Sequence, residues 1–340
     1  RRVPLAAAWD ALHGLRWWQV ALFALANGAV VLALNGRWWV LLRAGNQLSV
    51  NHHPITDYRL RITSCGRLTL HRLAAFGVSY FTPGPQFGGE PVQVLLTVRD
   101  GVPRPAAVTA VALDKSIELL ANFGFLLAGV VVTLQAGVFG GQLGRGAVWL
   151  AVALFLLPLG LLAAVWRGGR PFSRLWRLVP HQWPRVRPIG QAIAESEGQM
   201  TAVCHEAPSA LAGAVLFSAV SWLALVSEYW LMFWFLSVEL TAVQTLIIMT
   251  TARVAFLLPL PGGLGILEAG QVTAVSALGF DPALGMGAAL LIRARDVALA
   301  LVGFGWGAFL LGRGAGGQRR RGASVSPAPP LPTLFRGGFT

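Results

Sequence analysis

The chain has 340 residues, of which 55% are hydrophobic and only 12% are charged, whereas an ordinary soluble domain carries about 25% charged residues. The charges are also clustered, because seven long stretches contain none: 17–36, 73–89, 119–144, 146–166, 207–227, 254–267 and 297–312. Uncharged apolar stretches of about 20 residues have the length of a helix that crosses a bilayer. Composition therefore excludes a soluble protein and predicts an all-α, polytopic membrane helical bundle, since helices pair their own backbone groups in lipid.

The net charge of +13 comes almost entirely from arginine. In a soluble chain such a charge would suggest a nucleic-acid partner, but arginines beside apolar segments are what the positive-inside rule expects. We therefore expect no nucleic-acid partner. The two cysteines, Cys65 and Cys204, are far apart and lack metal-ligand spacing, so they indicate neither a disulfide framework nor a metal site. We also expect no cofactor. No recognisable catalytic motif occurs, and the chain is not expected to be an enzyme.

Five membrane spans are predicted in chain order: 17–36, about 110–136, 147–166, 209–236 and 283–311. Four basic stretches, 37–72, 99–104, 167–187 and 313–321, are placed in the cytoplasm, and the poorly charged loops 137–145 and 237–243 outside. This arrangement predicts a multi-pass protein of the cytoplasmic (inner) membrane with a cytoplasmic C-terminus. It also puts residue 1 outside, so we expect one further transmembrane helix upstream of it.

Residues 1–312 are expected to form one transmembrane domain. It comprises a first repeat at about 17–136, a cytoplasmic amphipathic linker at about 167–206 and a second repeat at about 209–311. Residues 313–340 are rich in Arg, Gly and Pro, and we expect a disordered basic tail because proline-rich sequence cannot form a helix.

The two repeats share a motif in which Pro and Gly interrupt an apolar segment. The first motif contains Pro83, Gly84, Gly88, Gly89 and Glu90, and the second contains Pro261, Gly262, Gly263, Gly265 and Glu268. In each, the Glu follows a Pro by seven residues. A charged group follows in the next long helix: Asp114 and Lys115 after Glu90, and Arg293 after Glu268.

The expected topology places these motifs on opposite sides of the membrane. Segment 73–98 lies between two cytoplasmic stretches, whereas segment 244–279 lies between an outward and an inward span. The pattern predicts two broken, re-entrant helical hairpins in an inverted repeat, the arrangement that holds the binding site of many transporters near the bilayer midplane. A single Pro-Gly break more often marks only a turn, so the prediction depends on the matched pair.

Several charged residues interrupt the apolar runs, and each would cost about 2.5–3.5 kcal/mol at the centre of a lipid-facing helix. They are Asp114, Lys115, Glu118, Glu228, Arg253, Glu268, Arg293, Arg295 and Asp296. Helical spacing predicts that Lys115 pairs with Glu118 and Arg293 with Asp296. These pairs are either purely structural or part of a site in which Lys115, Arg293 and Arg295 hold an anionic headgroup.

In the second interpretation Glu90 and Glu268 contact a cationic group or orient the arginines. The candidate substrate-binding residues are Pro83, Gly84, Gly88, Gly89, Glu90, Asp114, Lys115, Pro261, Gly262, Gly263, Gly265, Glu268, Arg293 and Arg295.

Four segments together resemble the lysylphosphatidylglycerol synthase transmembrane family, also called the flippase-like domain: 35–38, 83–91, 112–115 and 258–268. The resemblance covers about residues 10–312, and the Pro-Gly-Gly-x-Gly-x-x-Glu element at 261–268 is its most specific part. Lys115 departs from the pattern because many members have Arg there, and Gln93 stands near a position where Arg is frequent. Lys115 keeps the positive charge but lacks the planar pair of donors of Arg, and Gln93 carries no charge.

The resemblance implies an inner-membrane protein that moves a phospholipid, or a related anionic or aminoacylated lipid, across the bilayer. We expect no lysyl-lipid synthesis, because the residues after Arg313 are too few for the soluble synthase domain. One alternative is an integral-membrane transferase acting on a lipid-linked substrate, with Glu90, Asp114 and Glu268 as acid–base groups. Another is an assembly partner that uses its Pro-rich tail, and a homo-oligomer or a membrane partner is compatible with the sequence.

Overall fold

The computed structural model describes residues 16–52, 64–82, 88–138, 144–177, 187–258 and 260–322, and every regular element in these ranges is helical. The elements are α2 (Trp17–His52), α3 (Cys65–Phe81), α4 (Glu90–Arg99), α5 (Arg104–Gln135), α6 (Arg145–Trp166), α7 (Pro171–Trp176), α8 (Arg187–Glu206), α9 (Pro208–Phe235), α10 (Ala242–Leu257), the short 3₁₀ turn η2 (Pro261–Gly263), α11 (Ile266–Ala277) and α12 (Pro282–Gly322). The all-α prediction is confirmed.

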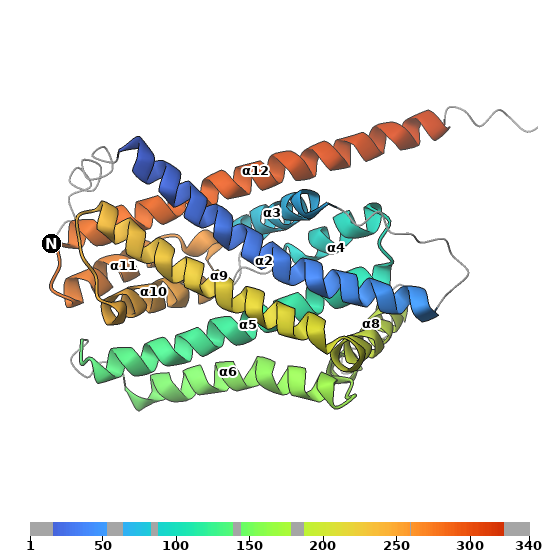
Figure 1. The fold of residues 1–340 in the computed structure, drawn as a ribbon, viewed down its shortest axis with the longest axis horizontal. Coiled ribbons are helices and arrows are strands. Elements are labelled where there is room, and N and C mark those ends of the chain that lie inside the picture. Colours follow the sequence, from blue (N-terminus) through green and yellow to red (C-terminus); the bar gives the residue numbers. More distant parts are fainter. Residues whose placement is uncertain are drawn as a thin grey trace, which may run out of the picture.

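Among the described residues, four helices are long and apolar enough to cross a membrane: Trp17–Leu48 of α2, Arg104–Gln135 of α5, Gly146–Trp166 of α6 and Pro208–Phe235 of α9. They form an elongated bundle (Figure 1). Large apolar side chains point outward from it, among them Leu25, Trp149 and Leu223, each about 70% exposed. Such surfaces are rare on soluble monomers and suit a lipid environment, so the chain is a membrane protein.

Helix α2 is longer than the span expected at 17–36, since it continues through Arg37 to His52. The sequence ended this span before Arg37, and this boundary is wrong because the helix continues through Arg37, whose side chain is fully buried inside the bundle. At the other end of the chain, α12 contains the segment 283–311 and continues to Gly322. It therefore extends into the segment that was expected to be disordered.

Two pairs of short helices flank the predicted breaks. Helices α3 and α4 lie on either side of the first break, and α10 and α11 lie on either side of the second. Figure 1 shows α10 and α11 at the end of the bundle where α9 ends and α12 begins, whereas α4 lies toward the opposite end, where α5 begins.

The two halves of the chain pack into each other. Helix α2 lies against α9, α3 against α12, and α5 against α10. Two of these contacts require glycine: a Cβ atom at Gly303 of α12 would lie 1.9 Å from the carbonyl oxygen of Leu73, and one at Gly129 of α5 would lie 1.9 Å from Thr250 Oγ1. Backbone-to-backbone packing through small residues is typical of membrane helices.

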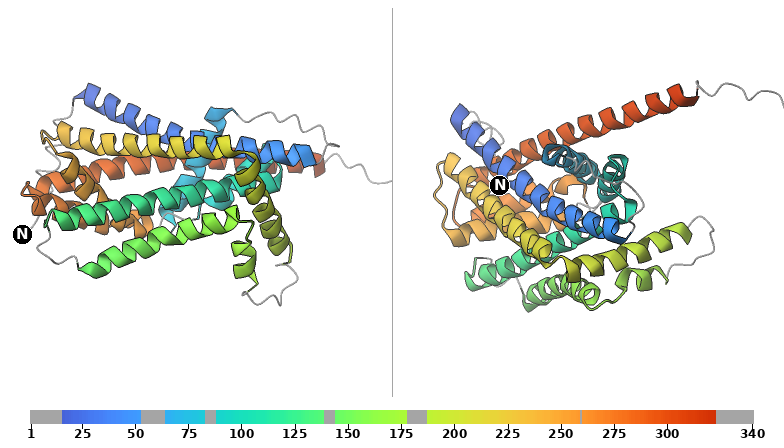
Figure 2. Two further views of the ribbon diagram at one scale, coloured as in Figure 1. Left: turned by 60° about the horizontal axis from the view of Figure 1, so that its bottom comes forward. Right: turned by 45° about the vertical axis from the view of Figure 1, so that its right-hand side comes forward.

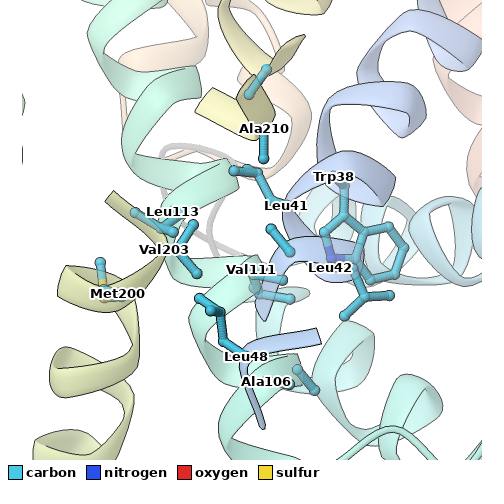
Figure 3. Close-up of a cluster of buried hydrophobic side chains, with 14 of the residues drawn as sticks. Trp38, Leu41, Leu42, Leu48, Ala106, Val111, Leu113, Met200, Val203 and Ala210 are labelled. Atoms are coloured by element: carbon cyan, nitrogen blue, oxygen red, sulfur yellow. The ribbon is translucent and has the colours of Figure 1, made fainter. Parts of the chain in front are cut away.

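The expected linker contains α7 and α8, and α8 runs across the long helices at one end of the bundle (Figure 2, left). The buried carboxylate of Glu197 in α8 accepts hydrogen bonds from the first backbone N–H groups of α7, those of Phe172 and Ser173. Met200 and Val203 of α8 belong to the same buried core as Trp38 of α2 (Figure 3). The linker is thus packed into the core at this end of the bundle.

Candidate functional site

The first break brings the N-terminus of α4 against α3. Pro83 and Gly84 lie outside the described residues, but Gly88 and Gly89 are described. The backbone N–H of Gly88, which has φ 125°, donates to Glu90 Oε2 at 2.8 Å. The N–H of Gly89 donates to Ser79 Oγ at 2.9 Å, and a Cβ atom at Gly89 would lie 2.0 Å from the carbonyl oxygen of Ala75. This close approach fixes Glu90 at the start of α4.

Lys115 of α5 reaches Glu90 from the next long helix. Its Nζ lies 3.3 Å from Glu90 Oε1 and 3.0 Å from Glu118 Oε1. The predicted pairing of Lys115 with Glu118 is confirmed. The ammonium group of Lys115 therefore links Glu90, at the start of α4, to Glu118 within α5.

Two arginines complete this cluster. Arg37 of α2 donates from Nε to Asp114 Oδ1 at 2.7 Å and from Nη2 to Glu118 Oε2 at 3.0 Å. Arg72 of α3 donates to the same two carboxylates, at 3.0 Å to Asp114 Oδ2 and 3.3 Å to Glu118 Oε2. We call Arg37, Arg72, Lys115, Glu90, Asp114 and Glu118 the first charge cluster. It contains three cations and three carboxylates, so it is formally neutral.

The second break has a different backbone. Pro261 opens the turn η2, and Gly262, Gly263 and Gly265 have φ values of 55°, 64° and 79°, a region that favours glycine. A Cβ atom at Gly262 would lie 2.8 Å from the ring of Tyr80 and 3.0 Å from Arg293 Nη1. The glycine therefore lets the turn approach α3 and α12 at the same time.

Arg293 of α12 forms hydrogen bonds with α11, with α3 and with the turn η2. Its Nε and Nη2 donate to the two oxygens of Glu268 at 2.8 and 3.2 Å, a two-pronged ion pair between α12 and α11. Its Nη1 donates to the hydroxyl of Tyr80 at 3.1 Å and also to the carbonyl oxygen of Gly262. The planar guanidinium suits such a role because its donors point in fixed directions.

A second charge cluster comprises Glu228 of α9, Arg253 of α10, and Arg295 and Asp296 of α12. Arg295 donates to Glu228 and, at 2.9 Å, to Asp296. The predicted pairing of Asp296 with Arg293 is therefore wrong: Asp296 bonds its chain neighbour Arg295, while Arg293 faces Glu268. With two cations and two carboxylates, this cluster too is formally neutral.

One cavity of about 1270 Å³ adjoins both clusters. Its polar wall contains Arg37, Arg72, Glu90, Asp114, Lys115, Glu118, Glu228, Arg253, Arg295 and Asp296. Its apolar wall includes Leu126 and Val130 of α5 and Leu150, Leu154 and Leu157 of α6. The volume exceeds that of most small-molecule sites, which measure about 300–1,000 Å³.

The predicted site residues divide into three groups. Gly89, Glu90, Asp114, Lys115, Gly265 and Arg295 line the cavity; Gly88, Pro261, Gly262, Gly263, Glu268 and Arg293 are described but are not among its lining residues; Pro83 and Gly84 are outside the described residues. Among the described residues, no group of three or more His, Cys, Asp or Glu side chains could hold a metal ion.

The family model for the lysylphosphatidylglycerol synthase transmembrane region matches residues 1–303. The chain belongs to this family. No curated protein matches the chain, and no solved structure does. Membership establishes a membrane protein connected with lipids, and it agrees with the four apolar helices and the outward-facing leucines.

In this member of the lysylphosphatidylglycerol synthase transmembrane family, sequence reasoning missed part of the cavity. Arg37 and Arg72 were counted only as members of the basic stretch 37–72 and not as site residues, although both bond to Asp114 and Glu118 within the bundle. One signal was present in the sequence: Arg37 directly follows the uncharged run 17–36 and precedes Trp38-Trp39 and further apolar residues. A single charge inside a long apolar stretch can mark an interior ion pair rather than the end of a span.

Proposed function

We propose that this protein is an integral-membrane lipid translocase that moves a phospholipid across the cytoplasmic membrane. The observation that carries the proposal is the cavity, in which charged side chains form one wall and leucine side chains of α5 and α6 form another. A phospholipid likewise has a charged part, its headgroup, and an apolar part, its acyl chains. The headgroup would occupy the polar wall while the chains remain against apolar surface.

Energetics support a functional role for the polar wall. Each charge in a bilayer interior costs several kcal/mol unless it is paired or reaches water. The first charge cluster meets this cost by pairing, and the side chains of Arg37 and Asp114 are almost completely buried. Membrane proteins keep such expensive groups mainly where a polar substrate or ion must pass.

We propose further that α2–α5 and α9–α12 are two halves of an inverted repeat. The ion pair between Glu90 and Lys115 joins residues 25 apart, and Glu268 and Arg293 form an ion pair at the same separation. In this repeat α3 corresponds to α10 and α5 corresponds to α12. The packing of α3 on α12 is therefore the symmetric counterpart of the packing of α10 on α5. Alternating access would then come from rocking of one half against the other.

Orientation is the first test of the repeat. The proposal places the start of α3 in the cytoplasm and the end of α11 outside. Cys65 is exposed at the start of α3, and Ala277 is exposed at the end of α11. A membrane-impermeant maleimide should label Cys65 only in inverted vesicles, and Ala277→Cys, introduced with Cys65→Ser, only in right-side-out vesicles. Labelling of both from one side contradicts the inverted repeat.

Translocation itself is tested with headgroup-labelled phospholipid in proteoliposomes. Glu90→Gln, Glu268→Gln and Arg293→Gln should each lower the flux at least about tenfold, because each removes a charged hydrogen-bond partner. The exposed Glu206 of α8 provides a matched control, and Glu206→Gln should leave the flux unchanged. If all three variants fold and transport at the wild-type rate, the site assignment is wrong.

A transferase acting on a lipid-linked substrate is the second candidate, since Glu90 and Asp114 line the cavity and could exchange protons with a bound substrate. Both carboxylates are already held by Lys or Arg, which favours a binding role. A labelled donor incubated with the purified protein separates the two functions. A covalent product without lipid flux would establish the transferase.

A further inference from the structure

The cavity as a whole carries no formal net charge. Among the residues the structure describes, its wall contains five cations and five carboxylates: Arg37, Arg72, Lys115, Arg253 and Arg295 against Glu90, Asp114, Glu118, Glu228 and Asp296. A headgroup with a net charge would leave that charge uncompensated within the bilayer, which is costly. A headgroup with equal positive and negative charge would not.

Within this balanced wall, one cation differs from the others. Arg253 has no carboxylate within ion-pair distance and no hydrogen-bond partner in the described part of the chain. Its guanidinium lies 4.9 Å from the centre of the Trp222 ring, and Trp222 stacks on Phe125 at 4.5 Å. The aromatic contact positions the guanidinium without neutralising it. An arginine held in this way retains all its donors for a phosphate.

The same cluster also contains a carboxylate oxygen that has no hydrogen-bond partner in the described structure. Glu228 is 2% exposed, and its Oε2 is buried without a hydrogen-bond partner in the described residues. Its other oxygen accepts from Arg295, which also bonds Asp296. One arginine therefore serves two carboxylates, so this part of the cluster is locally negative. Buried carboxylate oxygens without a partner are rare in folded proteins, and this one belongs to a residue of the cavity wall.

We infer that the second charge cluster binds a zwitterionic phospholipid headgroup, with the phosphate on Arg253 and a primary ammonium group on Glu228 Oε2. This inference rests on the proposed translocase function and specifies its substrate class. Both residues line the cavity, and Glu228 lies close enough to Arg253 to interact with it electrostatically. The site thus presents one positive and one negative group to a ligand that has both.

The cluster also predicts how the preference would change with charge. Glu228→Gln removes a negative charge and makes the cavity wall formally positive, so an anionic headgroup becomes the better match. Arg253→Gln does the opposite and makes a cationic headgroup the better match. These shifts in opposite directions distinguish a headgroup site from a structural ion-pair cluster, which would lose stability in both variants without changing preference.

The experiment compares three labelled lipids in the same proteoliposomes: phosphatidylethanolamine, which is zwitterionic, phosphatidylglycerol, which is anionic, and lysylphosphatidylglycerol, which is cationic. Wild-type protein should move phosphatidylethanolamine at least about tenfold faster than the other two, the ratio expected when a charged hydrogen bond is lost. Glu228→Gln should raise the transport rate of phosphatidylglycerol relative to that of phosphatidylethanolamine. Arg253→Gln should raise the transport rate of lysylphosphatidylglycerol relative to that of phosphatidylethanolamine.

A matched control exists on α2, where the guanidinium of the exposed Arg43 lies 4.1 Å from the Trp39 ring, also in a cation–π contact. Arg43 is not among the residues that line the cavity in the described structure, so Arg43→Gln should change neither rate nor preference. The double variant Glu228→Gln/Arg253→Gln restores a neutral wall and should recover the wild-type order of preference at a lower rate.

Binding is measured separately from transport, by mass spectrometry of the lipids retained on the purified protein in detergent. If the wild type moves all three lipids equally and the single variants do not change their order, the headgroup inference is wrong and the translocase proposal stands. If the wild type moves none of them, the translocase proposal fails. Preferential retention of phosphatidylethanolamine would then still support the binding site, and equal retention of the three lipids would overturn it.

Discussion

The hydroxyl of Tyr80 accepts a hydrogen bond from Arg293 Nη1 at 3.1 Å, across 213 residues of sequence. Tyr80 is the penultimate residue of α3, and Arg293 lies within α12. The same guanidinium nitrogen donates to the carbonyl oxygen of Gly262 in the second break. One guanidinium nitrogen therefore connects, through two hydrogen bonds, the end of the first broken helix to the turn of the second.

Removal of this hydroxyl tests the connection. Tyr80→Phe keeps the ring against Gly262 but deletes the acceptor for Arg293, and we expect a loss of stability of about 1 kcal/mol. The free energy of unfolding in detergent and the lipid flux should both be measured. Since the bond joins the two halves, flux should fall more than stability alone explains. Unchanged flux would show that the contact only assists packing.

The first charge cluster predicts a large cost for removing one partner. Asp114→Asn leaves the fully buried Arg37 with Glu118 as its one carboxylate partner among the described residues. Breaking a buried ion pair in this way costs about 3–5 kcal/mol. The double variant Asp114→Asn/Arg37→Gln should be less destabilised than the sum of the single variants, measured by denaturant unfolding. Additive effects would contradict the pairing.

The close packing of α12 on α3 can be tested with two glycine variants of α12, one inside the contact and one outside it. A Cβ atom at Gly303 would lie 1.9 Å from the carbonyl oxygen of Leu73, whereas one at Gly305 would meet nothing within 4 Å. Gly303→Ala should therefore destabilise the contact of α12 with α3 by about 1–3 kcal/mol. Gly305→Ala should be neutral or slightly stabilising, because alanine favours helix. Equal thermal unfolding temperatures for the two variants would contradict the packing.

The two cysteines should differ in reactivity. Cys204 in α8 is 4% exposed, and burial raises the pKa of its thiol; Cys65 is exposed. A raised pKa lowers the thiolate fraction at a given pH, and the thiolate is the nucleophile. A maleimide at pH 7–8 should label only Cys65 in the folded protein and both thiols after denaturation. The variant Cys65→Ser should stay unlabelled until unfolded, and rapid labelling of that variant would contradict the packing of α8.

Much of the fold could be predicted from hydropathy. The spans expected at 147–166 and 209–236 agree closely with α6 and α9, because uncharged runs end at charged residues or loops. The same rule failed for α2, where Arg37 is an interior residue neutralised by Asp114. Hydropathy records that a residue is charged but not whether another helix supplies its counter-ion.

The site was partly predictable for a similar reason. Equal spacing in the two motifs indicated that Glu90 relates to Lys115 as Glu268 relates to Arg293, and the structure forms both ion pairs. Pairs between distant helices carry no such signal. Arg295 bonds Glu228, 67 residues earlier, and this contact arises only when α9 and α12 pack together.

The two charge clusters also differ in where along the chain their members lie. Every member of the first cluster falls between residues 37 and 118, and every member of the second falls between residues 228 and 296. During synthesis, the N-terminal half can therefore neutralise its interior charges before the C-terminal half has left the ribosome. Each half therefore contains the counter-ions for its own interior charges, and the contact of Tyr80 with Arg293 joins two halves that do not depend on each other for charge balance.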